Sequence, residues 1–158
     1  MASSDLQLRH MSAVVARWFE RRGFIMAMAN PGDHELLRTE LGLDAQHHID
    51  VIAFAMSLFS GDSLMEFGLG HPLDDAEDID RCLARAAAVI GPANAVWLFF
   101  PARAWQALSD AERTAAEPRM RQQEVGLLLI DGHTCTKVFD AVDNRYSPNP
   151  RPRGGIPF

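Results

Sequence analysis

The stretch IDVIAFAMSLFSGDSLMEF, residues 49–67, decides the fold of this chain. Residues 49–58 form an apolar run with strong strand character, and Ser60-Gly61-Asp62 after it predicts a tight turn. A second strand is predicted over residues 63–67. The stretch therefore indicates a β-hairpin whose strands lie in the core of the protein.

The segments before this hairpin predict a helix followed by a short strand. Apolar residues recur with helical spacing, and Gly23 suits the position just past a helix end. Residues 24–28 predict a short buried strand stopped by residues 30–33, and residues 34–41 predict a short helix. The apolar helix positions are Leu8, Met11, Val14, Val15, Trp18 and Phe19.

The segments after the hairpin alternate between helix and strand signals. Ser109 with Glu112 three residues later is a capping box, which marks a helix start. Asp131-Gly132 between two apolar runs is a hairpin turn. The predicted elements are a helix opened by Asp74 and Glu77 and ended by Gly91-Pro92, a buried strand over 95–100, a helix from Ser109 to near Pro118, and a hairpin over 124–130 and 136–142.

This order of elements predicts an α/β fold. We expect a single domain over residues 1–146 with a central mixed sheet, an αβββαβ core and a C-terminal hairpin. Residues 147–158 are rich in proline, arginine and glycine, which favours a tail or a surface strap over a packed element.

The composition excludes several classes of protein. The chain has 158 residues, of which 47% are hydrophobic and 23% charged, and this is typical of a folded globule. Its apolar runs are far shorter than the ~20 residues that a bilayer span requires, so no membrane association is expected. The N-terminus lacks the pattern of a signal peptide, and Cys82 and Cys135 are too far apart for a metal-ligand pair. A reduced, cytoplasmic setting is the expectation.

The charge balance bears on nucleic-acid binding. The formal net charge is −6. Coating of nucleic acid depends on neutralising phosphates, so this balance disfavours a non-specific nucleic-acid-binding protein. It leaves room for a protein that contacts nucleic acid through a local patch.

Two carboxylates stand inside the apolar strands of the hairpin. Asp50 begins the first strand and Glu66 lies within the second. Burying an ionised carboxylate is costly unless it is paired or bound to a cation, so two of them on adjacent strands predict a shared divalent cation. The structural alternative is that Asp50 caps a strand end and Glu66 lies on a half-exposed face.

The chain resembles the PD-(D/E)XK (restriction-endonuclease-like) nuclease superfamily, in particular small Holliday-junction-resolvase-type and related bacterial DNA-repair domains. The resemblance covers residues 11–101 well and 124–142 loosely, and rests on the first helix with Arg22-Gly23-Phe24, Ile49-Asp50-Val51-Ile52-Ala53 and Leu64-Met65-Glu66-Phe67. It implies an αβββαβ core, Asp50 as the first metal-binding aspartate, and Glu66 as the acidic residue of the E-x-K element. Catalysis in such a site uses Mg²⁺ or Mn²⁺ to cleave phosphodiesters.

The chain departs from the family pattern at several positions. Gly68 stands two residues after Glu66, where active members carry a lysine. Ile49 replaces the proline before Asp50, and the glutamate of the resolvases' first helix would fall near Ser12. Arg81 or Arg85 on the following helix could supply the missing cation, and Arg81 fits a solvated helix residue equally well.

Histidines near the two carboxylates are further candidate ligands. His47 and His48 precede the Asp50 strand and His71 follows Glu66. A mixed site of His48, His71 and the carboxylates would suit Mn²⁺ or Zn²⁺ better than Mg²⁺. Loop histidines without a ligand are the plainer interpretation.

Two functions from different classes fit these observations. One is a metal-dependent nuclease-like domain for nucleic-acid processing, with weak or degenerate activity. The other is a non-catalytic protein-interaction or scaffolding module that keeps the nuclease-like fold. A basic face near Asp50 and Glu66 would favour the first, because a nuclease must neutralise phosphates locally.

Overall fold

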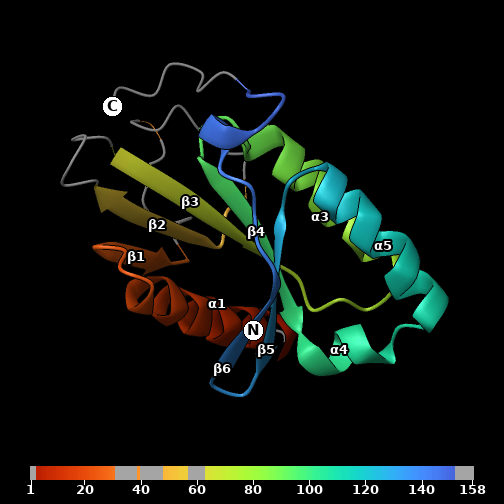
Figure 1. The fold of residues 1–158 in the computed structure, drawn as a ribbon. Helices are drawn as coiled ribbons and strands as arrows, with labels where there is room; N and C mark the ends of the chain where they lie inside the picture. The colour runs from red at the N-terminus through yellow and green to blue at the C-terminus, as the bar shows by residue number, and fades with distance from the viewer. Residues whose placement is uncertain (1–2, 31–38, 40–47, 57–62, 152–158) are drawn as a thin grey trace.

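The computed structural model describes residues 3–30, 39, 48–56 and 63–151 (Figure 1). Its elements form one sheet with helices on both faces. In chain order they are α1 (Ser3–Arg21), β1 (Met26–Ala29), β2 (Val51–Met56), β3 (Ser63–Gly70), α3 (Glu77–Val89), β4 (Ala95–Pro101), α4 (Ala102–Ala107), α5 (Asp110–Gln122), β5 (Gly126–Asp131), β6 (Thr134–Phe139) and the 3-10 turn η2 (Asn144–Tyr146).

The six strands lie in the order β1-β2-β3-β4-β5-β6. β1, β2 and β3 pair antiparallel, β3-β4 and β4-β5 pair parallel, and β5-β6 pair antiparallel. Parallel neighbours need a crossover, which α3 provides between β3 and β4, and α4 with α5 between β4 and β5. The α/β fold with a mixed sheet, an αβββαβ core and a C-terminal hairpin is therefore confirmed.

The sheet separates two apolar cores. Alternate side chains of a strand point to opposite faces, so Trp97 and Phe99 of β4 pack against α1, whereas Leu98 and Phe100 pack against α3, α4 and α5. Every residue of β4 is buried, as expected of a central strand between two parallel neighbours.

The predicted first helix is confirmed, and among the described helices it is the one that covers this face of the sheet (Figure 1). Met11, Val14, Val15 and Phe19 form its buried stripe. Gly23 follows the helix with φ +98°, a left-handed conformation that costs glycine little.

The first strand differs from its prediction. A buried strand was expected over residues 24–28, but β1 spans Met26–Ala29 at the edge of the sheet, and Ile25 is 74% exposed. The reason is that local sequence marks an apolar strand without indicating whether one or two neighbours will pair with it. β2 and β3 confirm the predicted strand pair, whereas the turn at residues 60–62 lies outside the described residues, as does the helix predicted over 34–41 apart from Thr39.

The helix predicted to end near Pro118 continues to Gln122. Its capping box at Ser109 and Glu112 is present as predicted. Pro118 removes one backbone hydrogen bond, but Ala116 and Met120 on either side of it are buried against the sheet, and this packing outweighs the loss.

The predicted tail begins with residues that are attached to the domain. Buried Asn144 donates through Nδ2 to the Arg151 carbonyl at 2.7 Å and accepts the Arg151 N–H at 2.8 Å. Ser147 Oγ lies 2.8 Å from Glu124 Oε1. Residues 147–151 therefore form a strap rather than a free arm, and residues 152–158 lie outside the described part.

Within residues 3–30, 39, 48–56 and 63–151, no helix has the length and apolar character that crossing a membrane requires.

Candidate functional site

Polar side chains gather at the carboxyl end of β3, where the chain leaves the sheet for α3. In α/β sheets, ligands commonly bind outside the carboxyl ends of parallel strands. Asp50, His48, His71, Asp78, Arg81 and Arg85 meet here. The sequence indicated each member of this group except Asp78, whereas Glu66 lies elsewhere.

Asp50 is, with Asp78, the most buried member of the group. It precedes β2 and is 3% exposed. Its Oδ2 accepts the Gly70 N–H at 2.8 Å and a bond from Arg85 Nη2 at 3.2 Å. Its Oδ1 lies 2.9 Å from Nε2 of His48, whose ring is largely exposed. Both carboxylate oxygens are therefore engaged by the chain itself.

Arg85 joins this carboxylate to the backbone on either side of it. From α3, Arg85 Nη1 donates to the Gly70 carbonyl at 3.3 Å, and Nη2 donates to the His48 carbonyl at 3.2 Å. The guanidinium thus connects the segment entering β2 with the last residue of β3. A fixed positive charge stands beside Asp50, where the sequence predicted a metal ion.

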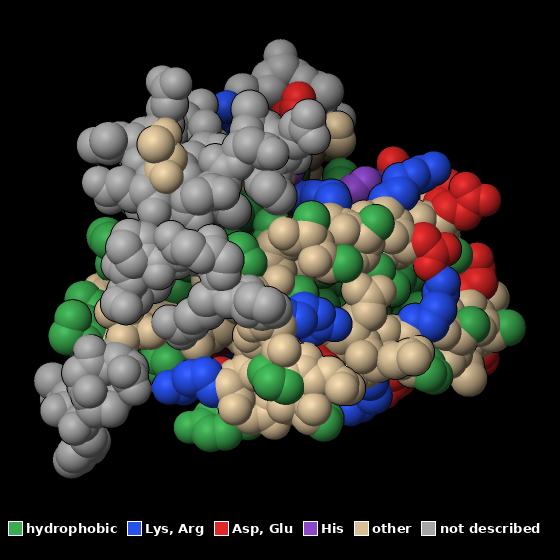
Figure 2. Space-filling view, turned by 90° about the horizontal axis from the view of Figure 1, so that it is seen from above, with side chains coloured by type: hydrophobic (Ala, Val, Ile, Leu, Met, Phe, Trp, Pro, Cys, Tyr) green, Lys and Arg blue, Asp and Glu red, His purple; other side chains and the backbone are tan. Residues whose placement is uncertain are grey.

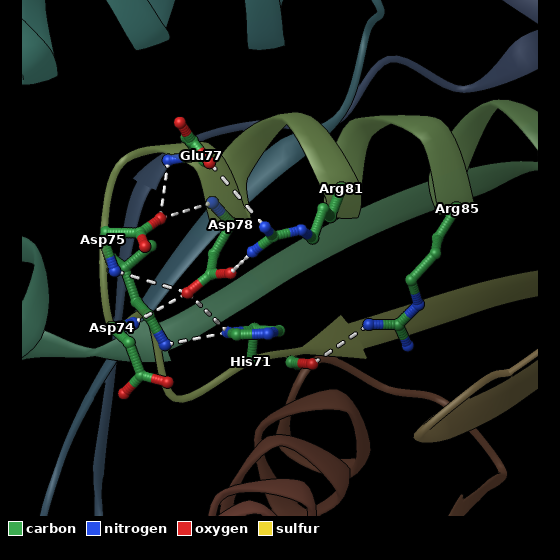
Figure 3. Close-up of polar contacts among 9 residues, drawn as sticks. His71, Asp74, Asp75, Glu77, Asp78, Arg81 and Arg85 are labelled. Atoms are coloured by element: carbon green, nitrogen blue, oxygen red, sulfur yellow. Dashed lines mark hydrogen bonds and ion pairs between the residues drawn. The ribbon is translucent and has the colours of Figure 1, made fainter.

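His71 and Asp78 organise the loop between β3 and α3 (Figure 3). The His71 Nδ1 accepts the Leu73 N–H at 2.9 Å and lies 3.6 Å from Asp78 Oδ2. Asp78 Oδ2 also accepts the N–H groups of Asp74 and Asp75. Leu73 has φ +60°, a strained conformation for leucine that these contacts hold in place.

The ionised form of Asp78 is favoured despite its burial. Burial alone raises the pKa of this carboxyl group, but the backbone N–H groups of Asp74 and Asp75, with His71 and Arg81, together lower the pKa below its usual value. Arg81 Nη1 pairs with Asp78 Oδ1, and Arg81 Nη2 lies 3.7 Å from Glu77. The Arg81 side chain is 62% exposed, as the alternative of a solvated helix residue implies, although it also pairs with the buried Asp78.

Glu66 lies on the other face of the sheet. Its Oε1 accepts a 2.7 Å hydrogen bond from Trp97 Nε1 and lies 3.8 Å from Arg22 Nη1. Burial raises the pKa of Glu66, although the Trp97 bond and the Arg22 charge act against this. Arg22 also stacks over Trp18, with its guanidinium carbon 4.4 Å from the ring centroid.

The structure does not bring Asp50 and Glu66 together. Glu66 is opposite Ala53 in the β2-β3 register, and Asp50 is three residues from Ala53, an odd separation that places the two carboxylates on opposite faces. Asp50 points toward α3 and Glu66 toward α1. The structure therefore does not show the convergence of these two carboxylates that a shared cation would need.

Gly68, the position where the resembling family carries a lysine, also lies on the α1 face of the sheet, away from Asp50. Gly68 is buried on the α1 face, and a Cβ atom there would lie 3.2 Å from both the Phe99 ring and Val51 Cβ. A lysine at this position would enter the core beneath α1, on the face away from Asp50. Gly68 therefore fits the packing of this sheet.

His48, His71 and Arg81 do not complete a metal site. His48 contacts Asp50, whereas His71 and Arg81 contact Asp78. Across the described ranges, no group of three or more histidine, cysteine, aspartate or glutamate side chains is arranged to hold a metal ion. His47 lies outside these ranges.

Asp78 was not predicted from the sequence, and Arg85 was predicted only as an alternative to Arg81. The available signal for Asp78 was its place in the first turn of the helix, after Asp74 and Asp75, where carboxylates accept free backbone N–H groups. No local signal distinguished Arg85 from Arg81.

Comparisons with protein-family models, with curated proteins and with solved structures return no match for this chain.

Proposed function

We propose that this chain is a non-catalytic binding module that keeps a nuclease-like fold. One observation carries the proposal: Asp50, the best candidate metal ligand, is paired with Arg85, while Glu66 faces the opposite side of the sheet. The order of helices and strands supports a relationship to the PD-(D/E)XK superfamily, and the arrangement of charges argues against its chemistry.

The electrostatic argument concerns the place where a cation would bind. Mg²⁺ is usually held by one or two carboxylates together with waters and substrate phosphates. Here Asp50 already accepts bonds from Gly70 and Arg85, and His48 stands at its second oxygen. A divalent ion would have to displace these partners and would be repelled by the guanidinium 3.2 Å from Oδ2. Arg85 neutralises the buried carboxylate without a metal.

Thermal unfolding with and without Mg²⁺ or Mn²⁺ tests the proposal. An ion that binds only the folded state at about 100 times its Kd stabilises by about 2.7 kcal/mol, which is roughly 5–11 °C in Tm for a chain of this size. We expect no such rise at millimolar metal concentration, and no metal-dependent cleavage of branched, single-stranded or duplex nucleic acid.

Asp50→Asn is the matched control, because it keeps the size of the side chain and removes its charge. Under the proposal, wild type and Asp50→Asn respond identically to the metals. A metal-dependent rise in Tm, or a cleavage activity, that disappears in folded Asp50→Asn would overturn the proposal and restore the metal-dependent nuclease.

A further inference from the structure

The arginines of this chain differ in whether a carboxylate neutralises them. The arginines of α3 and α5 are paired: Arg81 with Asp78, Arg85 with Asp50, Arg119 with Asp80, and Arg121 with Glu117. Basic and acidic side chains stand next to one another on the right of Figure 2, the side of these helices. Arg113, Arg145 and Arg151 likewise have carboxylate partners.

Helix α1 carries a different kind of arginine. Arg9, Arg17 and Arg21 are exposed, and within the part of the chain that the structure describes no carboxylate lies within ion-pair distance of them. Arg103 on α4 is the other described arginine in this condition. Three unpaired guanidinium groups therefore share one helix, and we call them the α1 arginines.

Helical geometry places the α1 arginines along one ridge. At 100° and 1.5 Å per residue, Arg17 and Arg21 lie about 6 Å apart along the axis, and Arg9 lies about 12 Å before Arg17. The three positions span roughly 120° of the helix circumference. The buried stripe through Met11, Val15 and Phe19 lies on the opposite side, so the ridge faces outward from the sheet.

The other charged residues of the helix reduce the positive charge of this ridge but do not cancel it. Asp5 and Glu20 are the acidic residues of α1, and Arg22 adds a positive charge at its end. Arg22 is held over the rings of Trp18 and Trp97 and near Glu66. Within α1, three arginines against two carboxylates leave one net positive charge, in a chain whose net charge is −6. This separation of charge places a basic face on an acidic protein.

We propose that the ridge formed by Arg9, Arg17 and Arg21 binds the phosphate backbone of nucleic acid. Unpaired guanidinium groups suit phosphates, because they offer donors and charge with no internal partner to displace. The ridge lies on the face of the sheet opposite α3 and α5 (Figure 1), away from the acidic side chains of these two helices, which would repel a polyanion. The inference rests on the proposed function, since it names the partner class of a module that binds without cleaving.

The number of phosphate contacts predicts the salt dependence. Each neutralised phosphate of duplex DNA contributes about −0.9 to the slope of log K against log salt. Three contacts give a slope of about −2.7, so binding measurable at about 20 mM salt falls by roughly two orders of magnitude at about 150 mM. The acidic remainder of the chain makes this contact weak and local.

The test is fluorescence anisotropy with a labelled DNA duplex of about 20 base pairs, titrated in EDTA over a range of salt. We expect binding by wild type at low salt. The double variant Arg17→Gln/Arg21→Gln should lower the magnitude of the slope by about 2. The matched control is Arg119→Gln/Arg121→Gln, which changes the net charge equally at ion-paired positions and should bind as wild type does. Circular dichroism establishes that both variants are folded.

Three outcomes would overturn the inference: no binding by wild type at low salt, equal effects of the two double variants, or binding of polyglutamate but not of DNA, which would indicate an acidic protein partner. Because EDTA removes divalent ions, failure here leaves the proposal of a non-catalytic module intact. Conversely, Asp50-dependent cleavage would refute that proposal without bearing on the ridge.

Discussion

Replacing Arg85 by methionine tests the central interaction of the candidate site. Methionine keeps much of the apolar stem and removes the guanidinium that contacts Asp50 and two backbone carbonyls. The variant leaves a 3% exposed carboxylate without its cation. Since burying an unpaired charge is unfavourable, we expect Arg85→Met to destabilise the fold.

The expected magnitude follows from how deeply each partner is buried. Breaking a fully buried ion pair by removing one partner costs about 3–5 kcal/mol, whereas exposed pairs contribute about 0–1 kcal/mol. The Asp50 side chain is 4% exposed and that of Arg85 28%, so the pair lies between these cases and nearer the first. We expect a loss of about 2–3 kcal/mol, which corresponds to a fall in Tm of roughly 4–12 °C for a chain of this size.

A double-mutant cycle separates the unpaired charge from the lost packing. Asp50→Asn removes the charge, so Asp50→Asn/Arg85→Met should be more stable than Arg85→Met alone. Arg81→Met is the matched control, one turn along α3, and should cost less because the Arg81 side chain is 62% exposed and its partner Asp78 keeps two backbone donors. Urea unfolding followed by circular dichroism gives the free energies. The reasoning is refuted if the double variant is no more stable than Arg85→Met, or if Arg81→Met costs as much.

Three further predictions concern other groups. The pKa of Asp78 is lowered in the folded protein, so ionised Asp78 stabilises the fold above about pH 3.8, and this contribution is lost as the pH falls through the pKa of the folded state. Asp78→Asn should therefore lower the free energy of unfolding by about 1–2 kcal/mol at pH 7. In acid, the Tm of the variant should approach that of wild type. The pKa of Glu66 is raised in the folded protein, so folding favours its protonated form. Glu66→Gln can still accept the Trp97 hydrogen bond and should be at least as stable as wild type at pH 7. A pH series of Tm values should show this advantage disappearing near pH 4.5. Truncation after Tyr146 should lower Tm by several degrees, because buried Asn144 loses both of its bonds to the strap; an unchanged Tm in calorimetry would contradict this account.

Much of the fold could be predicted because its signals are local. The helical period of α1, the capping box at Ser109 and the turn at Asp131-Gly132 each depend on neighbours a few residues away. Hence the order of elements and the α/β class followed from the sequence. The errors fall where distant residues decide: at β1, which is an edge strand, and at Pro118, where packing extends a helix past a residue that disfavours it.

The candidate site could be predicted only in part. Asp50 was identified because a carboxylate beside an apolar run requires a partner, and that argument holds. The sequence did not indicate which group in the chain contacts Asp50: in the structure it is a guanidinium 35 residues away on α3. A sequence shows that a buried charge must be compensated, but the compensating group is chosen by which helix packs over the strand.

The sequence alone did not indicate on which face of the sheet the Glu66 side chain lies. β2 and β3 are apolar on both faces, so no alternation of polar and apolar residues indicates which face a given side chain takes. The two carboxylates were therefore expected to converge. The register that pairs Ala53 with Glu66 places them on opposite sides instead. The sequence by itself determined the elements, their order and the presence of buried charges, because these depend on local pattern and composition. Only the tertiary structure decided which charged side chains meet, because the face of the sheet that a side chain takes depends on strand register and helix packing.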